Sequence, residues 1–543
     1  MTSRPPRPAT RSLHNHCCVN HDESIMWRAS PRRTRAGAPA RETVPLAGVP
    51  HVSTPPSPSH RDGVIDISEH TLTQQPTTSD RVSPPLHGPE IVARLDRLPV
   101  LKPHILWIAL IAINLMIEYY DNGLFIYIAP ALQSDANLTT GQIGTIGSAF
   151  FVGMLVGALI GGRLADRFGR RTVLVWATVV YSLASLMSAA MPEYSWLLVS
   201  RIITGIGVQA ATSVLLVYIA EMFPSKSRGR FVAIATIAFT LTAPILGALS
   251  LYMLPNSAPG TWRYLFLFGT IGLLIAPAVR LLLPESVRWQ VGQGDLDAAD
   301  KQVADLEGRA RHAGKPLPAP IVRIETGTQY TLRELVRNKK MLRLVAVVGF
   351  GWFGATLGLY MYQNWSVYVL IDSLQYSETD AYTIQFVWSL VYALTPLVTV
   401  VLIDRMERKT LILWSSAASA LPILALGLAT SNVVVAIAGG AAGILTGVVF
   451  SVYYAYIPET MPTEARGLGT GVIFSLGRLG GVLSGVLGAA IYSADEWGLD
   501  RSGLMISAAA VYIVSAIVVF GFGPKTANKS LEEVSARELR PAD

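Results

Sequence analysis

The stretch YIAEMFPSKSRG (218–229) returns later in the chain as YIPETMPTEARG (456–467), which sets a constant offset between equivalent positions (456 − 218 = 238). The same offset carries DRFGRR (166–171) onto DRMERK (404–409) without a gap. Two separate segments that agree on one offset are hard to obtain by chance. The sequence therefore predicts two related halves that repeat in the same direction along the chain.

Apolar stretches fill both halves. Of the 543 residues, 51% are hydrophobic and 15% charged, whereas soluble domains carry about 25% charged residues. We predict twelve spans that can each cross a bilayer as a helix, near 105–130, 143–162, 172–191, 196–220, 230–252, 263–283, 342–362, 382–403, 410–429, 433–457, 468–492 and 503–523. The expected fold is an all-α membrane protein of twelve transmembrane helices in two six-helix pseudo-symmetric halves. A parallel repeat of this kind places a substrate path between the halves.

Five regions follow from these spans. Residues 1–100 are rich in Pro, Ser, Thr, Arg and His and have no apolar period, which is typical of a disordered tail. The six-helix bundles are expected over 101–283 and 342–523, joined by a connection with surface helices over 284–341. Residues 524–543 form a second tail. The N-terminal tail has no apolar leader, so we expect no secretory signal peptide, and Met26 is an alternative initiator.

The net charge of +7 reflects topology and does not indicate nucleic-acid binding. Basic segments such as GRLADRFGRR (162–171) and RNKKMLR (337–343) alternate with opposite loops such as ALQSDANLTTGQ (131–142), which lack Lys and Arg. Positive charges concentrate on the cytoplasmic side of membrane proteins. We therefore expect a multi-pass protein of the cytoplasmic membrane with the 284–341 connection and both tails, 1–100 and 524–543, cytoplasmic.

Chemistry other than transport finds little support. The two cysteines, Cys17 and Cys18, are adjacent and lack the spacing of a metal site. The sequence offers no nucleophile constellation and no phosphate-binding loop. We expect no cofactor, no metal and no enzymatic activity.

Several motifs resemble the major facilitator superfamily over about 105–523. GRLADRFGRR looks like its loop motif, RIITGIG (201–207) with EMFPSKSRG (221–229) is similar to the sugar-porter pattern, and PESVRW (284–289) resembles the motif after the sixth span. Two departures stand out: Glu407 replaces a glycine of the second loop motif, and the glutamine-rich seventh span of sugar porters is absent. EYYDNGLF (118–125) looks more like metabolite:proton symporters and aromatic-acid or niacin transporters. The resemblance implies alternating access coupled to protons.

Glu118 and Asp121 are the only acids expected deep inside a span. A charge at bilayer depth costs at least ~2.5 kcal/mol, so two acids at this depth indicate a functional role. All nine histidines are expected outside the spans, which excludes a histidine relay. Asp121 is expected roughly 13 Å and Arg201 roughly 9 Å from the outer face of the membrane. These similar depths suggest that the two side chains form a pair. In related porters the matching Asp and Arg couple transport to protons. Glu118 lies one turn away on roughly the same face and is a candidate to titrate with Asp121 as a coupled pair. The alternatives are a static ion pair of Asp121 with Arg201, and a Glu118 that bonds a neighbouring hydroxyl or faces a wet cavity without titrating.

Arg478, roughly 15 Å into the eleventh span, is a candidate receptor for an anion. Its half provides no mid-span acid, and a guanidinium binds a carboxylate at two points. The alternative is that Arg478 pairs with Glu118 or Asp121, or bonds backbone carbonyl groups. Aromatic residues of spans seven and ten could line a pocket for a flat ring, although such residues often face lipid or pack; they are Trp352, Phe353, Tyr360, Tyr362, Trp365, Tyr453 and Tyr454, of which we favour Trp352, Tyr360, Tyr453 and Tyr454.

Charges at the cytoplasmic ends of the spans are expected to form ion pairs across the halves and to hold a gate shut. In the superfamily these motifs serve that gate, and exposed pairs worth about 0–1 kcal/mol suit a contact that must open. The residues are Asp166, Arg167, Arg170, Glu221, Arg228, Glu285, Arg288, Asp404, Arg408, Glu459 and Arg466.

Together these features predict a proton symporter that imports a small, carboxylate-bearing metabolite by alternating access. Its expected partners are that solute, protons and the lipid bilayer, and we expect it to act as a monomer. A sugar or polyol porter, a proton-driven exporter and a sensor without flux remain open.

Overall fold

The structure is a computed structural model that describes residues 87–191, 193–322, 330–462, 464–493 and 500–526. The first half contains α1 (Gly88–Asp96), α2 (Lys102–Ala136), α3 (Thr140–Phe168), α4 (Arg170–Ala189), α5 (Tyr194–Met222), α6 (Arg228–Met253), α7 (Trp262–Gly269) and α8 (Gly272–Leu282). The connection forms α9 (Val287–Gln293), α10 (Leu296–His312) and α11 (Leu332–Arg337). The second half contains α12 (Lys339–Gln363), α13 (Ser366–Tyr368), the π-helical turn η1 (Val369–Ser373), α14 (Glu378–Tyr392), α15 (Thr395–Ile403), α16 (Arg408–Leu428), α17 (Asn432–Thr460), α18 (Arg466–Tyr492) and α19 (Arg501–Phe522).

The predicted twelve spans are confirmed. Twelve helical stretches in the described residues are long and apolar enough to cross a membrane, six in each half. Three of them are composite: α7 with α8, α12 with α13 and η1, and α14 with α15. Polar residues mark where helices begin. The Thr139 side chain accepts from the amide of Gln142, and the Gln142 side chain returns the contact, which starts α3 with a capping box.

The repeat is visible in matched contacts at equivalent positions. Arg263, at the start of the sixth span, donates to the carbonyl oxygens of Ala189 and Met191 at 3.2 and 2.7 Å. Arg501, its equivalent in the second half, donates to those of Gly427 and Ala429 at 3.1 and 3.2 Å. The arginines and their acceptors are all related by the offset that relates the two loop motifs. Both arginines satisfy carbonyl groups that the end of a helix leaves without partners.

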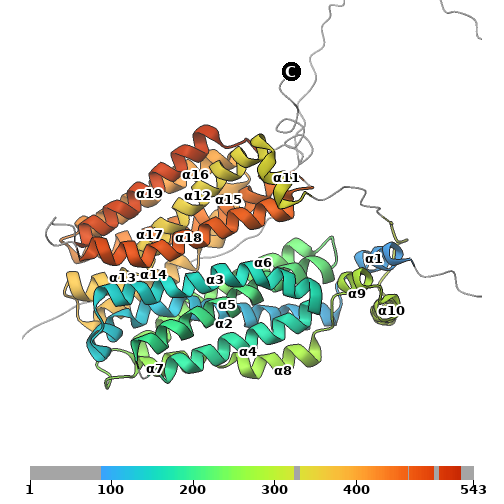
Figure 1. The fold of residues 1–543 in the computed structure, drawn as a ribbon, viewed down its shortest axis with the longest axis horizontal. Helices are drawn as coiled ribbons and strands as arrows, with labels where there is room; N and C mark the ends of the chain where they lie inside the picture. The colour runs from blue at the N-terminus through green and yellow to red at the C-terminus, as the bar shows by residue number, and fades with distance from the viewer. Residues whose placement is uncertain (1–86, 192, 323–329, 463, 494–499, 527–543) are drawn as a thin grey trace, which may run out of the picture. The chain divides into compact units, whose positions relative to one another are not determined.

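Two expectations about the start of the chain need correction. The tail was expected to run without structure to about residue 100, but Gly88–Asp96 forms α1, in which Ile91, Ala93 and Leu95 are buried. This helix contacts α9 and α10 (Figure 1). His104 was expected outside the spans, but it lies in the first turn of α2, fully buried, where its Nδ1 accepts from the Leu101 amide at 3.0 Å. The predicted tails over 1–86 and 527–543 lie outside the described residues.

Salt bridges hold α1 against α10. Arg94 pairs with Asp300 and, at 3.0 Å, with Glu307, and Arg97 pairs with Glu307 at 2.6 Å. Only 3% of the Glu307 side chain is exposed. Burial alone raises the pKa of Glu307, but hydrogen bonds and positive charge from Arg94 and Arg97 outweigh it and leave the pKa below its ordinary value. The connection is thus tied to the chain that enters the first span.

The halves contact each other at one end of the spans. We call the end that carries DRFGRR and DRMERK the motif end and the opposite end the far end. Within the described residues, hydrogen bonds between the halves lie from mid-span to the far end, as from Tyr382 to the Tyr127 carbonyl at 2.8 Å and between Thr140 and Tyr368 at 3.1 Å. The backbones of the two halves approach closely where a Cβ on Gly485 would lie 2.2 Å from the carbonyl oxygen of Gly144. Glycine at this position lets α3 and α18 meet.

Candidate functional site

Asp121 lies on α2 in a closed polar niche. Its side chain is fully buried, and Oδ1 accepts from the Ser185 hydroxyl of α4 at 2.7 Å. Oδ2 has no hydrogen-bond partner among the described residues. Gly269 of α7 makes room for the carboxylate, because a Cβ there would lie 2.9 and 3.0 Å from its two oxygens. A buried carboxylate with a free oxygen is costly and is a candidate for proton binding.

Arg201 lies beside Asp121, but the two side chains do not form the expected ion pair. Arg201 Nη2 donates instead to the backbone carbonyl of Asp121 at 2.9 Å. The guanidinium stacks over the Phe150 ring at 4.5 Å, and its Nε and Nη1 have no hydrogen-bond partner in the described chain. The static pair considered from the sequence is therefore absent in this conformation. Both partners retain unused donors and acceptors close to each other.

Glu118, one turn earlier on α2, is equally buried. Its Oε2 accepts from the Thr212 hydroxyl of α5 at 2.6 Å, while Oε1 has no partner among the described residues. Only 2% of the residue is exposed. This matches the alternative in which Glu118 bonds a neighbouring hydroxyl, and Thr212 was not anticipated from the sequence. The two acids thus contact different helices, α5 and α4.

Arg478 lies at the interface of the two halves. It is half-buried, and its Nη1 contacts Met154 Sδ of α3 at 3.9 Å. Its side chain also interacts with Tyr360, which in turn interacts with Asn122 of α2. In the part of the chain that the structure describes, Arg478 forms no ion pair with an acidic side chain. The alternative in which Arg478 pairs with Glu118 or Asp121 is therefore not realised here.

The favoured aromatic residues gather next to Arg478. Trp352 stands at the centre, with ring centroids 5.5 Å from both Tyr453 and Tyr454, and 4.7 Å from Phe450. Tyr360 packs on Phe151 of the first half at 4.4 Å. Exposure differs within the cluster: Trp352 and Tyr453 are buried, Tyr360 is half-buried and Tyr454 is 49% exposed. Trp352 and Tyr453 therefore pack, whereas Tyr360 remains accessible beside Arg478.

Two further aromatic candidates serve other contacts. The Tyr362 hydroxyl donates to the Gly439 carbonyl at 2.8 Å, and Trp365 is buried against Tyr368 and Tyr492. Phe353 packs half-buried against the core.

A cavity of about 40 Å³ between the halves was missed by sequence reasoning. Its polar lining consists of hydroxyl and amide groups without a charge, and Tyr119 contacts Tyr392 across it. The signal available in the sequence was the pair Gln363 and Gln385, two amides inside apolar spans. Its lining residues are Tyr119, Gly123, Ile126, Tyr127, Ala243, Leu246, Tyr362, Gln363, Ser366, Gln385, Trp388, Ser389, Tyr392 and Gly443.

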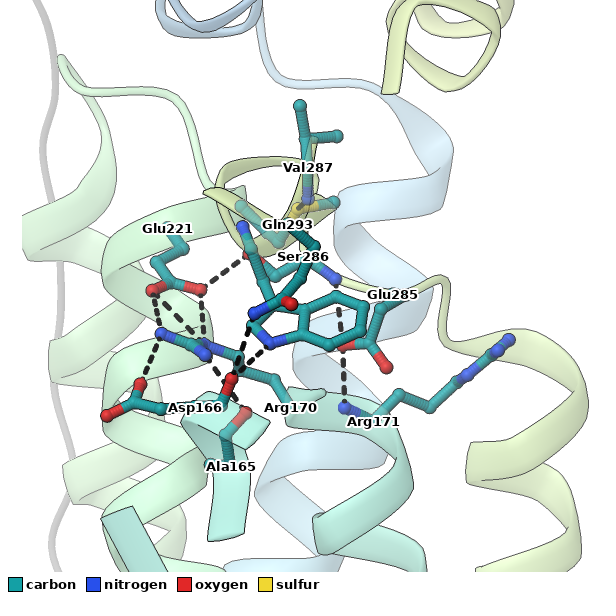
Figure 2. Close-up of polar contacts among 11 residues, drawn as sticks. Ala165, Asp166, Arg170, Arg171, Glu221, Glu285, Ser286, Val287 and Gln293 are labelled. Carbon is teal, nitrogen blue, oxygen red and sulfur yellow. Dashed lines mark hydrogen bonds and ion pairs between the residues drawn. The ribbon is translucent and has the colours of Figure 1, made fainter. Parts of the chain in front are cut away.

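At the motif end, the first half forms a closed polar network (Figure 2). Arg170 pairs with Glu221 of α5 and with Asp166, both at 3.0 Å. The Ser286 hydroxyl donates to the second Glu221 oxygen at 2.5 Å. Glu285 accepts from the Arg171 amide at 3.0 Å. The segment after the sixth span is thereby fastened to the ends of α3, α4 and α5.

The second half repeats this arrangement with weaker pairing. Arg408 lies 3.4 Å from Glu459, and it also donates to the Ile403 carbonyl, as Arg170 does to that of Ala165. The Thr526 hydroxyl donates to Glu459 at 2.7 Å, in the position that Ser286 has in the first half. Asp404 is exposed at the end of α15.

The expected ion pairs across the halves are not what these residues form. Arg170 with Glu221 and Arg408 with Glu459 each stay within one half, and Arg228 and Arg288 both pair with Asp96, at 3.5 and 2.7 Å. The Arg167 guanidinium lies over the neighbouring Phe168 ring. The Arg466 side chain is not free either, because it has a partner in the structure. In this conformation the motif charges brace each half internally, because the halves contact each other at the far end.

Comparisons with known proteins agree on this architecture. Over 454 residues the chain is 28% identical to the niacin transporter NiaP of Acinetobacter baylyi, covering 82% of this chain and 99% of that protein. It is also 28% identical over 420 residues to the gallate transporter of Pseudomonas putida, covering 76% and 91%. The inward open structure of the xylose transporter XylE from E. coli superposes with a TM-score of 0.61, at 19% identity, over 79% of this chain and 98% of that one.

The likeness to the xylose transporter concerns the fold, because the identity is low. Relatives and family alike are transporters and not enzymes. The family described as sugar (and other) transporter matches residues 108–537, which run from within the first span to beyond the last. The chain therefore belongs to the sugar (and other) transporter family of the major facilitator superfamily.

Proposed function

We propose that this transporter carries a small, carboxylate-bearing metabolite across the cytoplasmic membrane together with protons. The observation that carries the proposal is the open arrangement of Asp121 and Arg201. A fully buried carboxylate has one oxygen without a partner among the described residues, and the adjacent guanidinium has two such nitrogens. Buried polar groups are normally satisfied, so such an arrangement favours a change of partner during function.

The coupling step follows from the two states that this pair can adopt. A carboxylate removed from water favours its protonated form, and an approaching guanidinium favours the charged form. Arg201 now bonds the Asp121 backbone, which leaves the carboxylate available to a proton. Rotation of the guanidinium onto Oδ2 expels that proton. If the rotation follows the separation of the halves, proton uptake and release occur on opposite sides of the membrane.

Arg478 supports an anionic solute. It is half-buried between the halves with Met154 and Tyr360 as neighbours, so its positive charge is uncompensated there by the described side chains. A carboxylate that binds it removes this cost and gains two parallel hydrogen bonds. Niacin and gallate, named for two relatives, each carry a carboxylate on a flat ring. Tyr360, accessible beside Arg478, offers such a ring a surface.

The distribution of positive charge along the chain supports an orientation of the transporter in the membrane. The motif end carries the Lys and Arg clusters, which supports a cytoplasmic position for this end, because positive charge concentrates on the cytoplasmic side. With this orientation the contacts at the far end close the outer side, which supports a state that faces inward. Both termini are cytoplasmic in this orientation.

The uncharged cavity favours a second candidate, a neutral polyhydroxy solute such as a sugar. Tyrosine hydroxyls and the amides of Gln363 and Gln385 can bond hydroxyl groups without a charge. In that case Arg478 is dispensable for binding.

Proteoliposomes with an internal pH dye test both candidates. Nicotinate, gallate, xylose and tyramine are supplied outside, and uptake of each labelled compound is measured with the dye signal. Internal acidification with a carboxylate, lost in Asp121→Asn and kept in the exposed control Asp135→Asn, supports proton symport. Uptake of the carboxylate that is lost in Arg478→Gln and kept in the exposed control Arg280→Gln supports anion recognition. Acidification with xylose alone contradicts the carboxylate proposal, alkalinisation indicates an exporter, and uptake without a dye signal refutes coupling.

A further inference from the structure

The short segments that follow the last span of each half are equivalent. Pro284-Glu285-Ser286 follows α8, and Pro524-Lys525-Thr526 follows α19. The Tyr218 hydroxyl donates to the Pro284 carbonyl, and the Tyr456 hydroxyl to the Pro524 carbonyl, both at 2.9 Å. Tyr218 and Tyr456 are themselves a repeat pair. The offset between the segments is slightly larger than that between the loop motifs (524 − 284 = 240), so a short insertion precedes the second segment.

In the first half, a carboxylate from this segment fastens it to the motif loop. Glu285 Oε1 accepts from the amides of Ser286 and Arg171, both at 3.0 Å. The carboxylate occupies the place of a side chain on Gly169, where a Cβ would lie 2.4 Å from Glu285 Oε2. Gly169 also has φ = 94°, a conformation that favours glycine. The glycine and the glutamate therefore depend on each other.

In the second half, the carboxylate stands on the motif loop instead of on the segment after the last span. Position 525, equivalent to Glu285, holds a lysine, and position 407, equivalent to Gly169, holds a glutamate. Glu407 has φ = −60°, which accommodates a side chain. Its Oε1 accepts from the Thr526 amide at 2.9 Å, the bond that Glu285 makes with the Ser286 amide. The carboxylate comes from the loop and reaches the same backbone group.

We infer that Glu407 is the positioning residue of the second half, and that it replaces the missing carboxylate at Lys525. By holding the Thr526 amide, Glu407 sets Thr526 so that its hydroxyl reaches Glu459, the partner of Arg408. The departure of Glu407 from the loop motif and the lysine at 525 are then one change. A mere surface charge at 407 would need neither the bond to Thr526 nor a matching change at 525. The inference does not depend on the solute or on proton coupling.

A double-mutant cycle on the full-length protein tests the exchange. Hydrogen exchange at the Thr526 amide is measured by mass spectrometry in detergent micelles for the parent, Glu407→Gly, Lys525→Glu and the double variant. Loss of the acceptor in Glu407→Gly is expected to speed exchange at Thr526 at least roughly tenfold. The double variant rebuilds the arrangement of the first half, so its exchange is expected to return close to the parent rate. Such non-additivity marks direct coupling of the two positions.

Further variants keep the result interpretable. Glu407→Gln retains an acceptor oxygen and is expected to keep the Thr526 amide protected from exchange. It replaces Glu407→Gly in the cycle if that variant is too unstable to purify. Adding Lys525→Glu to Glu407→Gln is expected to leave exchange at Thr526 unchanged. Glu464→Gln, an exposed change at the same end, is expected to leave Thr526 unchanged. The inference is refuted if Glu407→Gly leaves exchange at Thr526 unchanged, or if the effects of Glu407→Gly and Lys525→Glu simply add.

Discussion

Gly485→Ala is expected to separate the two halves at the far end. A Cβ on Gly485 would lie 2.2 Å from the carbonyl oxygen of Gly144 and 2.5 Å from Ser148 Oγ, whereas ordinary contacts begin at 3.4 Å. One obstacle is backbone, which cannot rotate away, so the helices must move apart by roughly 1 Å. Overpacking of this kind costs about 1–3 kcal/mol, which shifts the balance between closed and open far ends by about 5- to 150-fold.

Thiol labelling measures the change without knowledge of the solute. The only two cysteines, Cys17 and Cys18, are replaced by serine. Ala489→Cys then places a thiol on α18, where the native residue is 4% exposed beside Gly144. A membrane-impermeant maleimide is expected to label this thiol at least about fivefold faster when Gly485→Ala is added.

The matched control is Gly471→Ala on the same helix, where a Cβ meets no atom within 4 Å. It is expected to leave the labelling rate unchanged. If Gly485→Ala elutes as a single species and still labels at the parent rate, the contact of Gly144 with Gly485 does not close the far end, and the reasoning is wrong.

Three further outcomes are expected. Gly269→Ala should weaken proton movement in the dye assay as Asp121→Asn does, because its Cβ would lie 2.9 Å from Asp121 Oδ1; unchanged acidification would contradict the role of that niche. Arg478→Lys should raise the KM of a transported carboxylate by roughly tenfold, because an ammonium loses the two-point contact, and an unaltered KM in labelled uptake would exclude it. Contact of α1 with α10 should be present near neutral pH and lost as pH falls through the lowered pKa of Glu307. The protection factors of the amides of residues 88–97, which compare the measured exchange with the intrinsic rate at the same pH, should therefore fall at acid pH in the parent and be low at every pH in Glu307→Gln.

The fold was predictable from the sequence because two independent signals agreed. Apolar runs of about 20 residues indicated the spans, and the constant offset between the loop motifs indicated the two halves. The structure extends the same offset to contacts that the sequence analysis did not predict, those of Arg263 and Arg501 with helix-end carbonyl groups. Helix α1 was not predictable in the same way, since composition over 1–100 hid a short amphipathic segment whose partners lie far along the chain, in the connection between the halves.

The sequence predicted which residues belong to the candidate site better than it predicted which atoms they contact. Depth along the spans brought Asp121 close to Arg201, but side-chain direction decides whether a guanidinium meets a carboxylate or a backbone carbonyl. The choice of Thr212 for Glu118 depends on how α2 packs on α5, which one sequence does not encode locally. The interfacial cavity depends on both halves at once, so lining residues such as Tyr119 and Tyr392 gave no separate signal.

The close approach of Gly144 and Gly485 makes α3 a lever. Gly144 lies near one end of this helix and Phe168 at the other, and the length of helix between them is about 36 Å at about 1.5 Å per residue. A rotation of about 10° about the glycine contact displaces Phe168 by about 6 Å, while the backbones at the pivot barely move. The displacement is therefore largest at the end that carries DRFGRR, and the pivot needs glycine because the two backbones touch there.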